Sequence, residues 1–411
     1  MPSAEPPLSA EPPLSAEPPP SAGVSLSAGV SRGVGVPTVV DCSGVGPGGI
    51  TRVLTEVVRY WPGGALRLVS VPETWEVPRD AEAEITVVSR QGGGRERTIA
   101  AATAAMRRAT AEPARVLSLS PSLAIVGSRL PVTTIVHDLA FRLWPHGLSQ
   151  AVRQYRRVSY GTAISRSARL VCVSARTRHD LLGLYGVEAS RTLLWRPGSD
   201  LAAPGELPPG LAGEFLVVAG HAAHKGVELA IEAMALLPAY TLVVLTGGNR
   251  IAAFTDAASR SAAADRIVFL DRLDEAAYAA TLAGAAAFLM PSHFEGYGLP
   301  AAEALALGTP TVISPDPALW EATGAAAVRM TSWTASALVS AVREACNPDA
   351  ADFAGTHRPA KAADASPPAA DAFRPVTAAG NNAVSVDHRA IAGVSRSWRV
   401  AAQELAEGLA G

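Results

Sequence analysis

Cysteine is scarce in this sequence. Only three of its 411 residues are cysteines, namely Cys42, Cys172 and Cys346, and their spacing matches no metal-ligand pattern. A small, odd number of cysteines in a chain of this length is typical of a reducing compartment, where thiols stay unpaired. We therefore expect buried, reduced thiols.

Excess charge, long apolar runs and a leader-like N-terminus are also missing. The 35 basic and 37 acidic residues nearly cancel, which disfavours a protein that holds nucleic acid by neutralising phosphates. Spanning a bilayer takes roughly 18–20 consecutive apolar residues, and the nearest approach, residues 276–291, is too short. The N-terminus lacks the basic-then-apolar plan of a signal peptide. We expect a soluble, cytoplasmic protein that binds no nucleic acid.

The length and the alternation of strand-like and helix-like segments indicate two domains, because 411 residues exceed one ordinary hydrophobic core. The segments differ in composition, and Pro-rich and Gly-rich stretches separate them. The predicted organisation is a disordered tail (1–36), an N-terminal Rossmann-like domain (37–198), a hinge linker (199–212), a C-terminal Rossmann-like domain (213–385, with a flexible insert at 347–385) and a terminal helix (386–411).

The first predicted strand, residues 38–42, runs into the glycine-rich loop SGVGPGG and then into a helix. Gly44, Gly46 and Gly49 match the pattern G-x-G-x-x-G, which is a weak signal on its own. Two interpretations stay open. Either the loop holds the pyrophosphate of a dinucleotide, with Glu73 after the next strand as its acidic partner, or it lets the backbone approach another phosphate or substrate.

A strongly β-branched strand at 132–136 ends directly at His137 and Asp138. Ligands of open α/β sheets lie at the carboxyl ends of the strands, so both residues are site candidates. A histidine satisfied within the core is the alternative. The helix predicted over 148–168 carries several arginines, and its basic face is either solvated or meets an anionic acceptor or a lipid headgroup. Peripheral membrane contact through 148–169 is therefore one predicted interaction.

The most informative stretch is PSHFEGYGLPAAEALALGTPTVISP at 291–315. Glu303 is the one polar residue of a helix predicted over 300–307, so its buried carboxylate needs a hydrogen-bond partner. Glu295 lies in the preceding loop, whose glycines leave the first backbone N–H groups of the helix open to an anion. Lys225, in a glycine loop at another helix start, adds a full positive charge. The alternative is a structural helix in which an arginine pairs with Glu303.

This stretch resembles the signature of the retaining glycosyltransferases of the GT-B fold, family-four type (glycosyl transferases group 1). Glu295 and Glu303 meet the hallmark E-x7-E, within EGYGLPAAEALALGTPTV. Weaker similarities are GPGGI, VHDL, VSARTRHDLLGLYGV, HKG and the segment 319–321. The resemblance implies an α/β fold of two Rossmann-like βαβ domains facing a central cleft, of which the N-terminal one (37–198) would bind the acceptor and the C-terminal one (213–385) the nucleotide-sugar donor. It also implies a terminal helix that crosses back to the N-terminal domain.

The implied activity is transfer of a hexosyl or deoxyhexosyl group from a nucleoside-diphosphate sugar to a hydroxyl of a glycan, lipid-linked or natural-product acceptor. The sugar nucleotide is a substrate and no cofactor is implied. No D-x-D triplet occurs in the chain, so no metal ion is expected either. The implied residues are His137, Glu295 and Lys225 as catalytic groups, Gly48, Gly49, Gly298, Leu299 and Glu303 for the donor, and Asp138 for the acceptor.

The sequence departs from the family at the phosphate loop, where an arginine usually accompanies the lysine. Here the neighbours of Lys225 are His221 and His224, and Arg196 is a candidate substitute. Two other functions remain open. One is a nicotinamide- or flavin-dependent oxidoreductase that uses the loop at 44–49, and the other is a GT-B sugar-nucleotide protein that is non-catalytic or an epimerase. These motifs specify neither the base, the sugar and the acceptor nor the oligomeric state.

Overall fold

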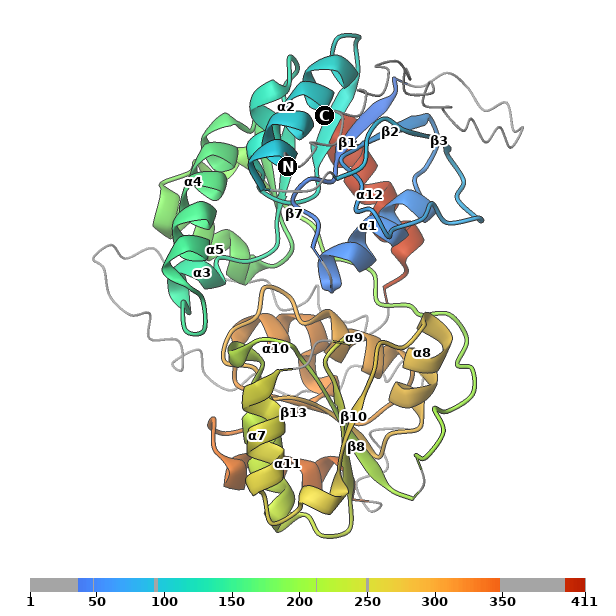
Figure 1. Ribbon diagram of the computed structural model, residues 1–411, viewed down its shortest axis with the longest axis vertical. Helices are drawn as coiled ribbons and strands as arrows, with labels where there is room; N and C mark the ends of the chain where they lie inside the picture. The colour runs from blue at the N-terminus through green and yellow to red at the C-terminus, as the bar shows by residue number, and fades with distance from the viewer. Residues whose placement is uncertain are drawn as a thin grey trace, which may run out of the picture.

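The computed structural model describes residues 36–46, 48–91, 95–211, 213–248, 251–347 and 396–410. The predicted tail at 1–36 and the predicted insert at 347–385 lie outside these ranges, apart from residues 36 and 347. The described residues form two α/β bodies, one above the other in Figure 1, and we call them the N-terminal and C-terminal domains.

The N-terminal domain is built on a seven-stranded sheet in the order β3-β2-β1-β4-β5-β6-β7, with every pair parallel. Its central strands are buried along their whole length, as parallel strands covered on both faces must be. The strands are β1 (Thr38–Asp41), β2 (Ala65–Val69), β3 (Glu84–Val87), β4 (Arg115–Ser118), β5 (Thr133–Val136), β6 (Arg169–Cys172) and β7 (Thr192–Leu194).

Helices cover both faces of this sheet (Figure 1). Within the described parts of the chain, no helix is both long and apolar enough to cross a bilayer. The helices are α1 (Gly49–Arg59), α2 (Arg95–Ala109), α3 (Ala140–Leu143), α4 (Gln150–Arg166) and α5 (Ala175–Tyr185), with short 3-10 turns η1 (Leu123–Gly127) and η2 (Ala189–Arg191).

The C-terminal domain repeats the plan with six parallel strands in the order β10-β9-β8-β11-β12-β13. Its strands are β8 (Phe215–Ala219), β9 (Thr241–Leu245), β10 (Ile267–Leu270), β11 (Ala287–Met290), β12 (Thr311–Ile313) and β13 (Val328–Arg329). Its helices are α6 (Val227–Ala233), α7 (Ala252–Arg260), α8 (Glu275–Ala283), α9 (Leu299–Ala306), α10 (Pro317–Thr323) and α11 (Ala335–Ala345), with the 3-10 turns η3 (Ala223–Lys225), η4 (Met234–Leu236), η5 (Ala264–Arg266) and η6 (Gly324–Ala326).

Each sheet has one topological switch point, where the strand order reverses. In the first sheet it lies between β1 and β4, and in the second between β8 and β11. Open α/β sheets bind ligands outside the carboxyl ends of the strands at this point, because the loops there diverge to opposite faces. The loop at 42–48 follows β1, and the loops at 220–226 and 291–298 follow β8 and β11. The topology of the second sheet therefore brings together the two loops that the sequence singled out, and the glycine loop lies at the switch point of the first sheet.

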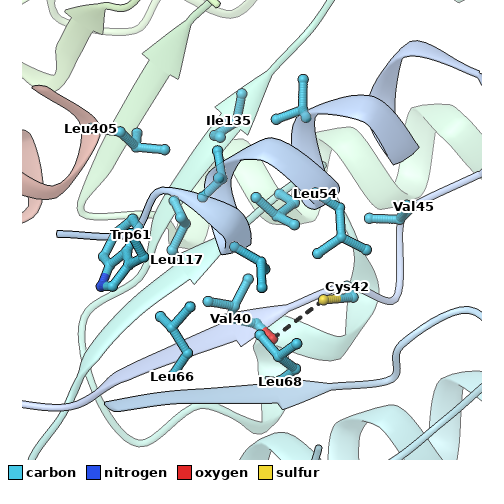
Figure 2. Packing of buried hydrophobic residues seen from close by; sticks show 14 of the residues in the cluster. Val40, Cys42, Val45, Leu54, Trp61, Leu66, Leu68, Leu117, Ile135 and Leu405 are labelled. Carbon is cyan, nitrogen blue, oxygen red and sulfur yellow. Dashed lines mark hydrogen bonds between the residues drawn. The ribbon is translucent and has the colours of Figure 1, made fainter. Parts of the chain in front are cut away.

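A terminal helix, α12 (Trp398–Ala410), packs on the N-terminal domain. Its Leu405 joins a core that includes Val40 of β1 and Leu54 of α1, as Figure 2 shows. Trp398 is fully buried in the same core. A Cβ added to Gly198 would lie 2.5 Å from the backbone of Trp398, so the returning chain requires a glycine there.

The predicted strand at 132–136 is observed as β5 (Thr133–Val136), and the helices predicted over 148–168 and 300–307 are observed as α4 (Gln150–Arg166) and α9 (Leu299–Ala306). Helix α6 ends at Ala233, and the 3-10 turn η4 continues it. Of the three cysteines, Cys42 and Cys172 are buried and Cys346 is partly buried, and all are free thiols.

Replacing Trp398 by alanine tests the contribution of α12 to the N-terminal core. Because the side chain is fully buried, Trp398→Ala is expected to lower the free energy of unfolding by about 3–5 kcal/mol. Urea unfolding followed by circular dichroism measures the change. Val400→Ala is the matched control, since Val400 lies on the same helix with 46% of its surface exposed. Equal effects of the two substitutions would show that α12 does not stabilise the domain.

Candidate active site at the domain interface

Lys225 and Glu295 form an ion pair between the loops that follow β8 and β11. The Nζ atom of Lys225 lies 2.8 and 2.9 Å from the two carboxylate oxygens of Glu295. The pair is largely buried, since Glu295 is only 6% exposed. The loops approach so closely that a Cβ on Gly226 would lie 2.3 Å from the carbonyl oxygen of Pro291. The sheet topology thus joins two predicted site residues that are far apart in the sequence.

Helix α9 begins at Leu299, four residues after Glu295. Its N-cap is Gly298, whose φ of 104° suits glycine and whose position leaves the helix without a side-chain cap. A Cβ there would also lie 2.4 Å from Leu319. The backbone N–H groups of Gly298 and Leu299 belong to the positive end of the helix dipole. The terminus therefore has the geometry of an anion site, and its role in binding a diphosphate stays a prediction.

Glu303 lies on the buried side of α9 and is 4% exposed. The hydroxyl of Tyr278 donates to it at 2.9 Å, and the Nε atom of Arg52 lies 4.0 Å away. Burial raises the pKa of Glu303 to about 7, although Arg52 and Tyr278 act in the opposite direction. The carboxylates of Glu275 and Glu56 raise it further. The pairing with an arginine, left open as the structural alternative, is thus present.

The sequence did not predict Arg52 as a site residue. It lies on the amphipathic helix α1, where an arginine is expected to be solvent-exposed. Its Nη1 atom lies 2.8 Å from Glu275 of α8 and 3.4 Å from Glu56. Its Nη2 atom donates to the backbone carbonyl of Asp200 at 3.2 Å. Its Nε atom is buried and has no hydrogen-bond partner among the described residues. One side chain thus connects the N-terminal domain, the linker and helices α8 and α9.

His137 and Asp138 follow β5, as predicted. The Nε2 atom of His137 lies 2.7 Å from the carbonyl oxygen of Leu119, which can only accept, so Nε2 carries the proton and Nδ1 keeps a lone pair. Burial lowers the pKa of His137, which favours this neutral form. Asp138 accepts from the backbone N–H of Ala140 at 2.9 Å and so helps to begin α3. Its contact with an acceptor stays a prediction.

The loop that carries Glu295 touches the N-terminal domain at Gly296. A Cβ at this position would lie 1.9 Å from the carbonyl oxygen of His137. The hydroxyls of Ser174 and Thr177 both donate to the carbonyl oxygen of Gly296, at 2.5 and 3.2 Å. His137 and Glu295, both predicted as catalytic groups, therefore lie on segments in direct contact.

The glycine loop reaches the same interface. Gly48 has a φ of 105°, and a Cβ on it would lie 3.4 Å from the ring of His221. Gly49 begins α1, and the hydroxyl of Thr51 closes the loop by donating to the carbonyl oxygen of Gly46 at 2.7 Å. The loop at 44–49 thus faces the phosphate-loop position where the family usually has an arginine.

The two histidines beside Lys225 do not replace the positive charge of that arginine. Burial and the charge of Lys225 lower the pKa of His221, and they lower that of His224 to about 4. Both imidazoles are therefore neutral at neutral pH. Arg196, the candidate substitute, is engaged elsewhere, with its Nη2 atom 3.1 Å from Glu321.

Two further predictions concern the oxidoreductase alternative and metal binding. Glu73, the acidic partner that a dinucleotide would need, is exposed, and its backbone carbonyl accepts from Arg90 at 3.1 Å. Among the described residues, no group of three or more His, Cys, Asp and Glu side chains is arranged to hold a metal ion. Metal independence itself stays a prediction.

Comparisons with known proteins match both halves of the chain. Residues 209–344 match the family model described as Glycosyl transferases group 1, and residues 47–203 match the one described as Glycosyltransferase Family 4. Together these matches cover both domains. The chain therefore belongs to the glycosyl transferases group 1, family-four type, and its fold is GT-B.

Individual relatives are more distant. A D-inositol 3-phosphate glycosyltransferase of Jonesia denitrificans is 32% identical over 36% of this chain and 41% of its own length. A glycogen synthase of Mycobacterium tuberculosis is 31% identical over 57% and 58%. The chain thus spans about two fifths to three fifths of these relatives. The Anabaena protein HepE, solved in complex with UDP and glucose, superposes with a TM-score of 0.64 at 16% identity, covering 92% of this chain and all of that one. This likeness concerns the fold.

Removing the guanidinium of Arg52 is expected to raise the pKa of Glu303 further above about 7, because the nearest positive charge is lost. A ¹³C-glutamate NMR titration of wild-type protein and Arg52→Gln measures the shift, and Glu303→Gln assigns the signal. Arg59→Gln is the control, since Arg59 lies on the same helix and pairs with Glu56 and Asp80. If Glu303 has the same pKa in Arg52→Gln as in Arg59→Gln, Arg52 does not stabilise that carboxylate.

Proposed function

We propose that this protein is a retaining, metal-independent glycosyltransferase that moves a hexosyl or deoxyhexosyl group from a nucleoside-diphosphate sugar to a hydroxyl acceptor. The observation that carries the proposal is the Lys225–Glu295 pair beside the uncapped start of α9, at the switch point of the second sheet. Family membership supports the reaction class. The names of the relatives and the UDP and glucose bound to HepE support the donor class.

The chemistry requires a site that stabilises negative charge on the leaving group. The bond between the anomeric carbon and the diphosphate oxygen breaks, and its electron pair stays on the diphosphate. Preorganised positive charge aimed at that oxygen lowers the barrier. The start of α9 supplies about half a positive charge, and Lys225 supplies a whole one. Glu295 holds the ammonium in place before the donor arrives.

Binding of the donor exchanges partners within the site. Glu295 turns from Lys225 to the hydroxyls of the donor sugar, and Lys225 turns to the diphosphate. Glu303 accepts hydrogen bonds from the ribose hydroxyls. This role requires its carboxylate to be ionised. Gly48 and Gly49 line the site from the other domain. His137, neutral with a lone pair on Nδ1, contacts the sugar near its anomeric carbon.

The anomeric configuration is retained because the acceptor attacks the anomeric carbon on the same face that the leaving group departs from. The acceptor hydroxyl forms the new bond to the anomeric carbon, and its proton passes to the departing phosphate oxygen. No carboxylate nucleophile is required, because the sugar and the diphosphate form a short-lived ion pair. Asp138, at the end of β5, lies on the acceptor side.

The acceptor is either soluble or presented at a membrane. On α4, Arg157 and Arg166 are exposed and Val158 is 49% exposed. These side chains favour peripheral contact of the segment 148–169 with an anionic surface. Such contact and a cytoplasmic location are part of the proposal.

A thermal-shift panel of UDP-, GDP-, ADP- and dTDP-sugars tests the donor class. A ligand that binds only the folded state raises the melting temperature by mass action. The sugar nucleotides of one base are therefore expected to raise it more than the others. Acceptor-dependent release of the matching nucleoside diphosphate then tests transfer. Binding without release, over many acceptors, would identify a non-catalytic protein, and product formation without an acceptor would identify an epimerase.

Lys225→Ala is expected to lower turnover by roughly 10²–10³, the usual loss when one charge-stabilising donor is removed from a transition state. The rate at saturating donor measures this effect apart from binding. Lys225→Arg is the control, since it keeps the charge beside Glu295 and should retain more activity than the alanine variant. If the alanine variant has the same turnover rate as wild type at saturating donor, Lys225 has no part in the mechanism.

A further inference from the structure

The loop that carries Glu295 is held between α5 of the N-terminal domain and α10 of the C-terminal domain, two helices in contact across the interface (Figure 1). The carbonyl oxygen of Gly296 accepts from the hydroxyls of Ser174 and Thr177 at the start of α5. The carboxylate of Asp316, the N-cap of α10, accepts from the backbone N–H of Glu295. The backbone is therefore held at Glu295 itself and one residue beyond it.

Arg176, in the first turn of α5, connects these two helices. Its Nη1 atom donates to Asp316 at 3.4 Å, across the domain interface, and its Nε atom donates to Asp180 of α5 at 2.8 Å. Its guanidinium carbon also lies 4.6 Å from the ring centre of Phe294, a buried side chain that directly precedes Glu295. One cation thus contacts the residue before Glu295 and the carboxylate that binds the backbone of Glu295.

The buried carboxylate of Asp316 depends on this cation. Asp316 is 2% exposed, and burial raises its pKa to about 6. Arg176 acts in the opposite direction, and the nearby charge of Glu295 raises the pKa further. Without Arg176, the two carboxylates would repel each other, or Asp316 would take up a proton and bind the backbone N–H less strongly.

The backbone contacts matter because Glu295 changes partners in the proposed mechanism. In the structure its carboxylate is held by Lys225, and this restraint is lost when the donor sugar takes the carboxylate. The contacts with the backbone do not involve the carboxylate of Glu295, so they persist when its partner changes. They determine where Glu295 meets the sugar, and a misplacement of 1 Å at a reacting centre can cost about 10²-fold in rate.

We propose that Arg176 is a positioning residue for Glu295, and that it acts through Asp316 and Phe294 without touching the substrate. Because Arg176 and Glu295 belong to different domains, Glu295 is in place for the sugar only while α5 and α10 are in contact. The role of Glu295 at the donor sugar rests on the proposed function, whereas the restraint on its backbone does not.

Hydrogen exchange on the unliganded full chain tests this restraint. Mass spectrometry with fragmentation resolves the backbone amide of Glu295. Arg176→Gln is expected to speed its exchange roughly tenfold, because a hydrogen bond to a charged acceptor is weakened. Arg178→Gln is the matched control and should exchange like wild type, since Arg178 lies on the same helix but donates to Thr192 within its own domain, at 2.8 Å. Equal exchange in wild type and Arg176→Gln overturns the proposal.

Calorimetry separates positioning from a general loss of structure. The probes are UDP, GDP, ADP and dTDP, each compared with its sugar derivative. Only the sugar contacts Glu295 in the proposed mechanism, so Arg176→Gln is expected to weaken sugar-nucleotide binding roughly tenfold, the effect of losing one well-placed hydrogen bond. Binding of the nucleoside diphosphate is expected to stay unchanged. The proposal is overturned if both ligands weaken by the same factor or if neither weakens.

A double-mutant cycle with Asp316→Asn tests whether Arg176 acts through Asp316. The effects of Arg176→Gln and Asp316→Asn on the exchange of the Glu295 amide are expected to be less than additive, because both substitutions remove the same contact. Additive effects would contradict the proposal. If wild-type protein binds none of the sugar nucleotides, the proposed function fails, while the exchange data still decide whether Arg176 holds the loop.

Discussion

A buried carboxylate needs a counter-charge, and here the charge comes from the other domain. Glu303 is 4% exposed on α9, and the nearest cation, Arg52, belongs to α1 of the N-terminal domain. Desolvating an unpaired carboxylate would be costly, so the closed arrangement of the domains and the ionised state of Glu303 depend on each other. The same guanidinium contacts Glu275 and the linker carbonyl of Asp200. Domain orientation is thus coupled to the chemistry of α9.

In the proposed mechanism, a donor that binds to Glu303 also alters this interaction between the two domains. In the proposed mechanism, a ribose that hydrogen-bonds to Glu303 supplies part of the stabilisation that Arg52 supplies in its absence. Lys225 and Glu295 satisfy the charge of each other in the structure, and in the proposed mechanism a diphosphate and a sugar replace these contacts. Exchangeable ion pairs therefore balance the charges of the site, so that no buried charge is left unpaired in an apolar surrounding.

Close backbone approach is the second constraint that shapes the site. Two glycines of the site cannot carry a side chain, since a Cβ would lie 1.9 Å from the carbonyl oxygen of His137 at Gly296 and 2.3 Å from that of Pro291 at Gly226. These contacts set the spacing between the loops after β5, β8 and β11. The sequence showed that the glycines allow tight turns, but the segments that they approach were visible only in three dimensions.

The sequence by itself determined the elements and the positions of Glu295 and Glu303 relative to α9. Short β-branched runs such as Phe215–Ala219 predict strands wherever they stand, and the E-x7-E spacing places Glu295 before a helix and Glu303 within it, since these properties are local. Only the tertiary structure decided which cation faces Glu303, that the histidines beside Lys225 are neutral, and that Arg176 pairs with Asp316 across the domain interface. These features depend on burial and on contacts between residues distant in the chain. Such contacts arise from sheet order and domain packing, which no local pattern specifies.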